Sequence, residues 1–291
     1  MLLLHKLTMK KIKRQEVRLA VVSRPGHKDA SLWHKKIERW ILRSYPWVRF
    51  DDTHPTVVII LGGDGTIIET SRMYLKENPL FIGLNLGTVG FMASVRNTKN
   101  FISALTSFFN GSYTIAERMV IQASVTRRKK IVWRTTALNE IMVQNLLGMV
   151  ELDVAIEHQP IQAIRGSGVF VATATGSTAY NMSAHGPIVM PNIKCMIVTE
   201  LLDHNIPTPS IVIRHDQKIS IRIQSFRKHQ RFILAESQMP VDVVLSADAA
   251  RLFPLEEKDE ILIEQAPSSV RFVEFESSYF FKSLGEKFGF R

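Results

Sequence analysis

The sequence predicts an α/β domain with a Rossmann-like parallel sheet, followed by an all-β, or at least β-rich, domain. At 291 residues the chain is long enough for about two domains. In its first part, three short apolar runs rich in Val and Ile alternate with stretches of helical periodicity. After about Ser112, short segments in which apolar and polar residues alternate replace this pattern. This change of pattern predicts two consecutive domains, the first made of a sheet covered by helices and the second made mainly of strands.

The apolar runs of the first domain are expected to be strands, since uninterrupted apolar strands between helices are typical of a parallel sheet covered on both faces. These runs are Val17–Val22, Thr56–Leu61 and Leu80–Leu84. The helices are expected at Ser31–Ser44, Thr66–Lys76 and Asn97–Phe109. Asn97 is the expected N-cap of the third helix, and Gly111 is its expected stop signal.

The second domain is expected to contain short strands with one buried face, because its apolar residues recur with a period of two. The expected strands are Met119–Val125, Ile131–Thr135, Glu151–Ile156, Lys218–Ile223, Arg231–Ala235, Val241–Leu245, Glu260–Glu264 and Val270–Phe275. The basic run Arg127–Lys130 predicts an exposed hairpin loop. The expected domains are residues 1–112 and 113–272. The segment 273–291, with a helix over Ser278–Phe288, is expected to pack on the first domain.

Composition excludes several classes of protein. Cys195 is the single cysteine, which excludes an internal disulfide framework and a Cys-rich zinc site. No run of 18 apolar residues is present, so no transmembrane helix is predicted. The opening Met1–Leu4 is interrupted by His5 and Lys6 and is too short for the core of a signal peptide. We therefore expect a cytoplasmic protein without a membrane partner.

The net charge of +10 comes from the N-terminal part of the chain. Residues 1–50 carry thirteen Lys and Arg but three Asp and Glu, whereas the rest of the chain carries equal numbers of both signs. The basic run Lys10–Arg14 lacks the interleaved aromatic residues of a nucleic-acid recognition element, so no nucleic-acid partner is expected. A solvated tail is the favoured interpretation, and an anionic ligand, a membrane surface and targeting are the alternatives. Met9 is an alternative start of the chain.

A glycine-rich turn follows the second expected strand, in the order Leu61-Gly62-Gly63-Asp64-Gly65-Thr66. Ligands of open α/β sheets bind at the carboxyl ends of the strands, and glycines there let the backbone approach a phosphate closely. The N-terminus of the following helix directs free N–H groups and a positive dipole end at an anion. The turn therefore predicts a phosphate-binding site.

Asp64 is the unexpected member of this turn, because a carboxylate repels a neighbouring phosphate. Its chemical uses there are to accept a proton from an attacking hydroxyl or to help hold Mg²⁺. The alternative is an Asx-turn that shapes the loop. The chain contains neither G-x-x-x-x-G-K-[ST] nor G-x-G-x-x-G, which argues against a P-loop enzyme and against an ordinary dinucleotide oxidoreductase.

Five segments together resemble the NAD kinase family. The segment Gly62–Thr66 alone is similar to a motif that NAD kinases share with diacylglycerol and sphingosine kinases and, more loosely, with phosphofructokinases. The segment Asn85–Met92 resembles the loop that follows the third strand in NAD kinases. It lacks the Gly-Thr-x-Asn-Asp pattern that lipid kinases tend to have there. The remaining segments are Leu138–Glu140, the block Thr175–Tyr180 with Ser183-Ala184 and Gly186-Pro187, and the closing Phe281–Phe290. The resemblance extends from about residue 17 to the end of the chain.

This resemblance implies transfer of the γ-phosphoryl group of ATP to the 2′-hydroxyl of the NAD adenosine ribose, with Mg²⁺ or another divalent cation. Under this interpretation Asp64 accepts the proton, and the phosphate site is formed by Gly62, Gly63, Gly65 and Thr66. The implied NAD-binding residues are Phe91, Asn139, Glu140, Ser167, Thr175, Thr178, Ala179, Tyr180 and Ser183. The chemistry agrees, because phosphoryl transfer needs positioning and charge neutralisation, and a Tyr ring can stack on adenine. Members of the family tend to be homo-oligomers.

The second domain departs from the family pattern. Where the family usually has an Asp between two small residues, this chain has Ser167, within Gly166-Ser167-Gly168. Where a later motif of the family begins with Asp, this chain has the longer Glu236, within Glu236-Ser237-Gln238. A neutral hydroxyl forms a weaker hydrogen bond than a carboxylate, about 1 against about 1.5–3 kcal/mol. These departures predict weaker or altered selection on the nicotinamide side of the dinucleotide.

Two other functions remain open at the level of the sequence. One is a kinase of the same fold that acts on a different nucleotide, and the other is a non-catalytic protein that senses NAD or NADP. Asp64 argues against the sensor, because a pure binder gains little from a carboxylate beside a phosphate. The sequence leaves open the phosphoryl donor (ATP or polyphosphate), the preference for NAD or NADH, allostery, and whether the oligomer is a dimer or a tetramer.

Overall fold

The computed structural model of the chain describes residues 17–87, 90–204, 208–229, 231–234, 238, 240–276 and 279–289. The chain divides into two compact units, the first containing the residues up to Glu117 together with those from Val270 onward, and the second containing Arg118–Ser269. The expected breaks after residues 112 and 272 lie within a few residues of these limits. The basic run Lys10–Arg14 and the segment with Glu236 lie outside the described residues.

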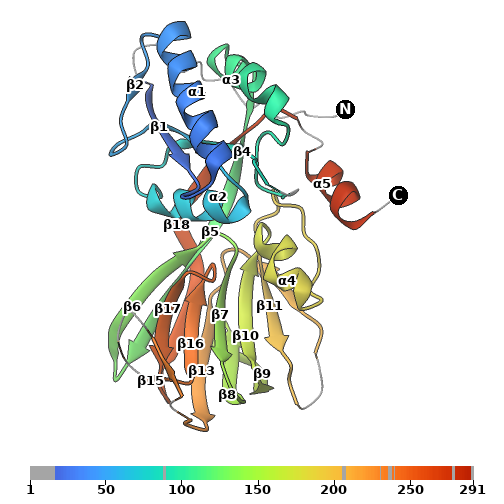
Figure 1. Ribbon diagram of the computed structural model, residues 1–291. Helices are drawn as coiled ribbons and strands as arrows, with labels where there is room; N and C mark the ends of the chain where they lie inside the picture. Colours follow the sequence, from blue (N-terminus) through green and yellow to red (C-terminus); the bar gives the residue numbers. More distant parts are fainter. Residues whose placement is uncertain are drawn as a thin grey trace. The chain divides into compact units, whose positions relative to one another are not determined.

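The first unit contains the expected parallel sheet with helices on both faces (Figure 1). Its strands, in spatial order, are β2 (Arg49–Phe50), β1 (Arg18–Ser23), β3 (Val57–Leu61) and β4 (Leu80–Leu84). The end of β18 (Glu260–Glu274) continues this sheet, because it pairs in parallel with β4 at Arg271 and Phe272. The helices are α1 (Lys28–Ser44), α2 (Asp64–Met73), the 3-10 turn η1 (Thr98–Asn100), α3 (Phe101–Phe109) and α5 (Tyr279–Phe288).

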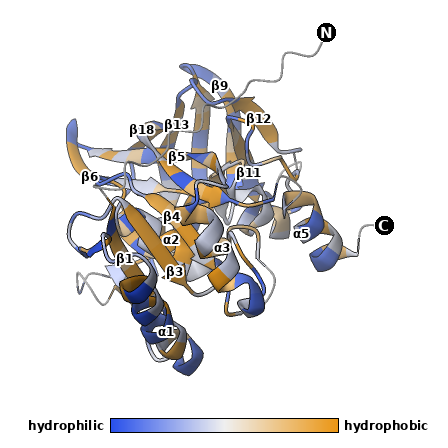
Figure 2. Cartoon of the chain, turned by 90° about the horizontal axis from the view of Figure 1, so that it is seen from above, coloured by the Kyte–Doolittle hydropathy of each residue, from blue (hydrophilic) through white to orange (hydrophobic). Residues whose placement is uncertain are grey.

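Strands β3 and β4 are buried at every position because helices cover both faces of the sheet. Ile37 and Ile41 of α1 and Phe101 of α3 pack into the core on one face. On the other face, the missing side chain of Gly83 leaves room for Ile67 of α2. Figure 2 shows hydrophobic residues concentrated in β3 and β4, whereas α1 is mixed and turns part of its surface to solvent.

The helix boundaries follow local signals in the chain. The side chain of Asn97, the expected N-cap of the third helix, caps the 3-10 turn η1 that leads into α3, accepting a hydrogen bond from the N–H of Lys99 at 3.0 Å, whereas the N-cap residue of α3 itself is Asn100. Gly111 follows α3 with φ of 80°, a conformation that glycine adopts without strain. Helix α2 begins at Asp64 rather than at the expected Thr66, since Gly63 has the extended backbone of an N-cap residue.

The second unit is built from two antiparallel sheets that share one core. In one sheet, β18, β13 (Ile219–Phe226), β8 (Val150–Ile156) and β9 (Gln159–Gly166) lie in that order, and β5 (Thr114–Arg127) pairs with β18 and β6 (Lys130–Ala137). The order of the other sheet is β12 (Ile211–Arg214), β11 (Cys195–Leu201), β10 (Gly168–Thr173), β7 (Glu140–Asn145), β16 (Val243–Ala247) and β17 (Arg251–Leu255). The remaining elements are β14 (Phe232–Ile233), β15 (Pro240–Val241), η2 (Gly176–Thr178) and α4 (Tyr180–Ser183).

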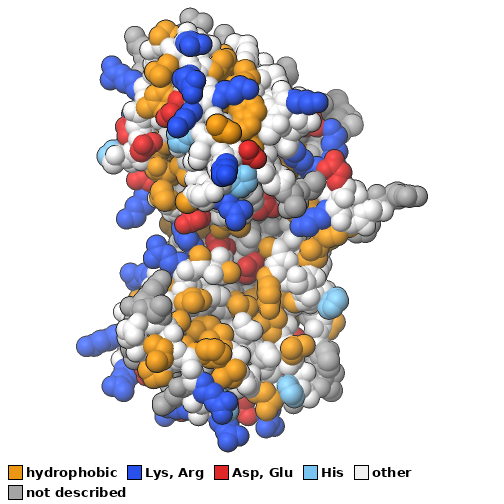
Figure 3. Space-filling view, viewed as in Figure 1, with side chains coloured by type: hydrophobic (Ala, Val, Ile, Leu, Met, Phe, Trp, Pro, Cys, Tyr) orange, Lys and Arg blue, Asp and Glu red, His pale blue; other side chains and the backbone are white. Residues whose placement is uncertain are grey.

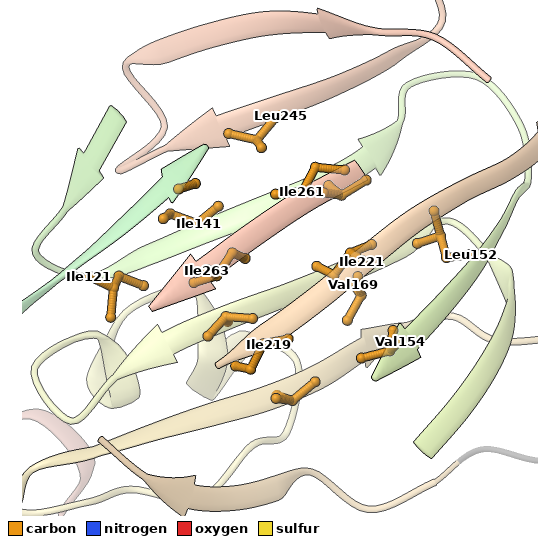
Figure 4. Close-up of a cluster of buried hydrophobic side chains, with 14 of the residues drawn as sticks. Ile121, Ile141, Leu152, Val154, Val169, Ile219, Ile221, Leu245, Ile261 and Ile263 are labelled. Carbon is orange, nitrogen blue, oxygen red and sulfur yellow. The ribbon is translucent and has the colours of Figure 1, made fainter. Parts of the chain in front are cut away.

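The core of the second unit is formed by branched aliphatic side chains from both sheets. Figure 4 shows Ile219, Ile221 and Ile261 from one sheet close to Ile141 and Val169 from the other. All five side chains are at most 1% exposed. Strands with one face on this shared core, such as β8 and β13, show the period-two alternation that the sequence predicts.

The period-two pattern does not predict the central strands of the second sheet. Strand β10 is buried at every position and β11 at every position except one, so neither alternates. The two strands expected at Glu260–Glu264 and Val270–Phe275 are one continuous strand, β18, which runs through the Ala-Pro-Ser-Ser segment between them. The strand expected at Arg231–Ala235 is reduced to Phe232–Ile233, and Ala235 lies outside the described residues.

The hairpin of β5 and β6 is fixed by a buried ion pair. Asp259 is fully buried, and its two carboxylate oxygens accept hydrogen bonds from Nε and Nη2 of Arg127 at 2.8 and 2.7 Å. The same carboxylate also accepts the backbone N–H of Glu256 at 2.8 Å. A buried carboxylate is tolerated only with such a set of donors.

Replacing Arg127 by Ala is expected to destabilise the protein by about 3–5 kcal/mol, because the Asp259 carboxylate stays buried without its partner. Urea unfolding measures this change. The control is Arg214→Ala, which removes an exposed ion pair with Asp216 and is expected to leave the unfolding midpoint nearly unchanged. Equal effects of the two substitutions would show that burial of the pair is unimportant.

Candidate active site

The glycine turn joins the end of β3 to the N-terminus of α2. Gly63 is the N-cap residue, and Asp64 is the first residue of the helix. The first N–H groups of a helix have no partner within it and carry a partial positive charge. A Cβ at Gly63 or Gly65 would meet no atom within 4 Å, so the space beside both glycines is open in the described part of the chain. The turn thus offers the donors and the room that a phosphate requires.

The other two members of the predicted phosphate site contact each other. A Cβ at Gly62 would lie 2.7 Å from Cβ of Thr66, so the threonine side chain fills the space that a larger residue would need. Gly62 also donates its backbone N–H to the carbonyl oxygen of Leu84 at 3.1 Å. These contacts fix the turn to the end of β4.

The Asp64 carboxylate is held by the loop that follows β4. Its Oδ2 atom accepts the backbone N–H of Phe91 at 2.9 Å, and its Oδ1 atom accepts that of Met92 at 3.3 Å. Gly90 lies so close that a Cβ there would collide with the carboxylate. Each oxygen still has a lone pair for another donor. The carboxylate is therefore oriented by backbone groups while it keeps the capacity to accept a proton. Thr88 and Val89 of this loop lie outside the described residues.

In the second unit, Asn139 and Glu140 lie at the start of β7. Both side chains are 8% exposed, and Oδ1 of Asn139 and Oε2 of Glu140 are buried without a hydrogen-bond partner among the described residues. Buried polar atoms in native structures nearly always have partners. These two neighbouring side chains are therefore a candidate ligand-binding position.

Asp248 fixes the backbone of this pair, and the sequence analysis missed it. Its Oδ1 atom accepts the N–H of Asn139 at 2.8 Å and that of Glu140 at 3.3 Å, and its Oδ2 atom accepts the N–H of Leu138 at 2.9 Å. Asp248 has φ of 49° in the turn between β16 and β17. An Asp between two apolar runs was a signal for a turn, but nothing in the sequence places that turn beside residue 139.

Burial raises the pKa of the Glu140 carboxyl group from its ordinary 4.5 to about 8, and the negative charge of Asp248 adds to the shift. The neutral form of Glu140 is therefore favoured at neutral pH while no ligand is bound. A carboxylic acid can both donate and accept a hydrogen bond, which suits the recognition of a hydroxyl group.

The predicted block of residues 175–183 begins beside this pair. Gly176 packs so closely on the backbone of Asn139 that a Cβ would collide with it. Thr178 is buried, and its hydroxyl donates to the carbonyl oxygen of Thr175 at 3.3 Å. Tyr180 is 42% exposed, with its ring edge-on to Phe170 at 5.7 Å between centroids. The half-buried Ala179 and the exposed Ser183 complete the block.

Ser167 lies apart from these residues. Ser167 precedes β10, whereas Thr175 follows the other end of this strand. Because β10 has six residues, its two ends are roughly 17 Å apart. Ser167 lines a different pocket of about 850 Å³, together with Arg165, His204 and His229. The described chain thus brings Asn139, Glu140 and the block 175–180 together, but it does not bring Ser167 to them.

No cluster of three or more His, Cys, Asp and Glu side chains suited to a metal ion occurs among the described residues. Mg²⁺ at nucleotide sites commonly keeps several waters and binds one or two carboxylates together with phosphates of the substrate. A site with Asp64 as its carboxylate is compatible with that pattern. In the same part of the chain, no helix is both long and apolar enough to cross a membrane.

Known proteins match nearly the whole of this chain. The family model described as the ATP-NAD kinase N-terminal domain matches residues 6–113, and that of the C-terminal domain matches residues 138–275. The NAD kinase of Lachnoclostridium phytofermentans is 32% identical over 235 residues, which are 79% of this chain and 79% of that protein. The chain belongs to the ATP-NAD kinase family. The NAD kinase of Mannheimia succiniciproducens is 26% identical over 293 residues and covers 93% of both chains.

Solved structures of this family share the fold of the chain. Yeast NADH kinase, complexed with NADH, has a TM-score of 0.82 at 21% identity, over 94% of this chain and 88% of that chain. An NAD kinase from Archaeoglobus fulgidus, in complex with ATP, has a TM-score of 0.70 at 23% identity, over 93% of this chain and 98% of that chain. The fold class expected for an NAD kinase is confirmed.

The stability of this NAD kinase family member is expected to depend on Glu140 as the pH changes. Between pH 4.5 and about 8 the folded protein keeps a proton that the unfolded chain has released, so this residue makes stability fall as the pH rises. Glu140→Gln removes that dependence, and the variant should gain stability relative to wild type, on the order of a few kcal/mol between about pH 5 and pH 8. Urea unfolding at several pH values tests this.

The matched control is Glu151→Gln, which changes a half-exposed carboxylate. A difference between wild type and Glu140→Gln that stays constant across the pH range would contradict the raised pKa of Glu140.

Proposed function

We propose that this chain transfers the γ-phosphoryl group of ATP to the 2′-hydroxyl of the adenosine ribose of NAD, producing NADP and ADP. The observation that carries the proposal is the Asp64 carboxylate, oriented by two backbone N–H groups in a glycine turn at the N-terminus of α2. Membership of the ATP-NAD kinase family supports the same reaction.

In the proposed reaction the ribose 2′-oxygen forms a bond to the γ-phosphorus while the bond from that phosphorus to the β–γ bridging oxygen breaks. The hydroxyl proton passes to the Asp64 carboxylate. The N–H groups at the start of α2 and the open backbone at Gly63 and Gly65 bind phosphate oxygens.

The dinucleotide is proposed to be held by the second unit. Oδ1 of Asn139 and Oε2 of Glu140, which have no partner among the described residues, form hydrogen bonds with ribose hydroxyls. The exposed face of Tyr180 stacks on adenine, and the backbone and hydroxyl groups of Thr175 and Thr178 bond its edge. Phe91 is buried, so its contribution comes through its backbone N–H rather than through an exposed ring.

Mg²⁺, when bound, neutralises charge on the phosphates. Asp64 is the carboxylate that the glycine turn offers to it, and phosphate oxygens and water supply the other ligands. Because the carboxylate has two oxygens, Asp64 can bind the cation with one of them and accept the hydroxyl proton with the other.

We further propose a homo-oligomer in the cytoplasm, assembled through the second unit. Figure 3 shows orange hydrophobic side chains gathered on the visible face of the β-rich unit. Large apolar residues of this unit that are at least 36% exposed include Ile161, Ile188, Met190, Ile193, Leu202 and Val212. Exposed apolar surface of this kind is often an interaction site.

The lone cysteine, Cys195, is free and buried, in agreement with a reducing compartment.

Asp64→Asn is expected to abolish the formation of NADP while most NAD binding remains, because the amide keeps the shape of the side chain but accepts no proton. An NADP-specific dehydrogenase coupled to the reaction with Mg²⁺-ATP and NAD measures turnover, and calorimetry measures binding. The same assay with NADH and with polyphosphate identifies the acceptor and the donor. Near-normal turnover of the variant would remove Asp64 from the mechanism.

If the purified wild-type protein makes no NADP but is stabilised by NAD, the proposal of an NAD kinase fails and a sensor or another acceptor is supported. The neutral residue at Ser167 favours a different nucleotide as the second candidate acceptor, and a panel of nucleotides then identifies it.

In the proposed homo-oligomer, with Ser167 of a second copy beside the dinucleotide, Ser167→Asp is expected to tighten NAD binding by about tenfold, because a charge-assisted hydrogen bond replaces a neutral one. Titration calorimetry measures the dissociation constant. The matched variant is Ser167→Asn, which has nearly the same size as Asp without the charge and should not tighten binding. Unchanged or weaker affinity of Ser167→Asp would show that Ser167 does not contact the dinucleotide.

A further inference from the structure

Helix α5 contacts the loop that orients Asp64, and the proposed reaction assigns this helix no role. The ring of Phe91 lies 6.0 Å from the rings of Phe280 and Phe288, and Nζ of Lys287 lies 4.9 Å from the centroid of Phe91. Phe91 is also the residue whose backbone N–H holds Oδ2 of Asp64. The side chain that packs on α5 and the backbone group that orients the carboxylate thus belong to one residue.

Arg96 makes a second connection to α5, five residues farther along the same loop. Its guanidinium group donates to Oγ of Ser283, to the carboxylate of Glu286 and, at 3.3 Å, to the carbonyl oxygen of Tyr279. It also lies 4.3 Å above the ring of Tyr279. Ser283 is fully buried. The planar fork of an arginine fixes direction as well as distance, so these contacts hold about two turns of α5, from Tyr279 to Glu286, against the loop.

This contact is not the arrangement that stability alone would select. The hydroxyl of Tyr279 and Nε of Arg96 are buried without a hydrogen-bond partner among the described residues. Burial raises the pKa of the Tyr279 phenol, Arg96 opposes this rise, and the charge of Asp64 contributes to it more weakly. A buried polar atom without a partner is rare in native structures and calls for a physical explanation.

We propose that Arg96 is a positioning residue for phosphoryl transfer: by fixing α5 against Phe91, it sets the orientation of the Asp64 carboxylate. The inference rests on the proposed role of Asp64 as proton acceptor. Arg96 itself touches neither Asp64 nor the reacting atoms. Its effect passes through the Tyr279–Phe288 helix and the ring of Phe91 to the N–H groups of Phe91 and Met92.

The kinetic test is Arg96→Lys, which keeps the charge but loses the planar fork. We expect kcat to fall by about tenfold or more while KM for ATP and for NAD changes by less than about twofold, because a misplaced catalytic group affects the chemical step. Glu286→Gln, at a residue with a half-exposed side chain, should give a smaller loss of kcat in the same direction. The matched control is Lys282→Gln, which removes an exposed ion pair between Lys282 of α5 and Glu276, a residue before the helix, and should leave kcat unchanged.

A second measurement needs no turnover. Hydrogen exchange of the backbone amides of Phe91 and Met92 should be faster by about tenfold in Arg96→Lys than in wild type or Lys282→Gln, because the amides lose their fixed partner when the loop opens. A merely stabilising contact would lower the melting temperature without changing kcat or the local exchange below that temperature.

The outcomes separate the two proposals. Wild-type kcat and wild-type exchange in a folded Arg96→Lys, with Asp64→Asn inactive, would overturn the role of Arg96 and leave the proposed function intact. Near-normal activity of Asp64→Asn would overturn the role of Asp64 and this inference with it. Loss of kcat together with faster exchange in Arg96→Lys, against an unchanged control, is the expected result.

Discussion

Two backbone N–H groups, those of Phe91 and Met92, hold the carboxylate of Asp64, and the arrangement of the first unit depends on this contact. It joins the turn after β3 to the loop after β4, which are adjacent because the two strands pair in parallel. Gly90 must lack a side chain for the contact to form. A carboxylate at a helix N-terminus is electrostatically favoured there, and the two N–H donors restrict it to one orientation.

In the second unit, too, backbone N–H groups bind a carboxylate. The carboxylate of Asp248 collects the N–H groups of Leu138, Asn139 and Glu140, and thereby presents the side chains of Asn139 and Glu140 from the start of β7. Oδ1 of Asn139 and Oε2 of Glu140 are buried without a hydrogen-bond partner in the part of the chain that the structure describes. In both units a carboxylate bound by the backbone defines the position of the groups that we assign to the substrates. Such preorganisation costs stability and is worthwhile only where a ligand restores the missing hydrogen bonds.

The comparison of sequence and structure is most informative where the two differ. The alternation of apolar residues predicts strands with one buried face, such as β8 and β13, but it gives no signal for β10, which is buried on both faces. Ser167 was grouped with the other NAD-binding residues by resemblance, yet β10 separates it from Thr175. Whether a dinucleotide reaches Ser167 in one copy of the chain or in a second copy is a question of assembly, which no local pattern encodes.

The sequence by itself determined the local features of this protein. Glycines at 62, 63 and 65 specify a turn before a helix, and Asn97 caps the helical turn that precedes α3, because each effect depends on a few neighbouring residues. Only the tertiary structure decided which distant groups meet: Phe91 with Asp64, Asp248 with Asn139, and Arg96 with α5. These contacts join residues that are 27 to 190 positions apart. Their geometry follows from strand register and helix packing, which the whole chain fixes together.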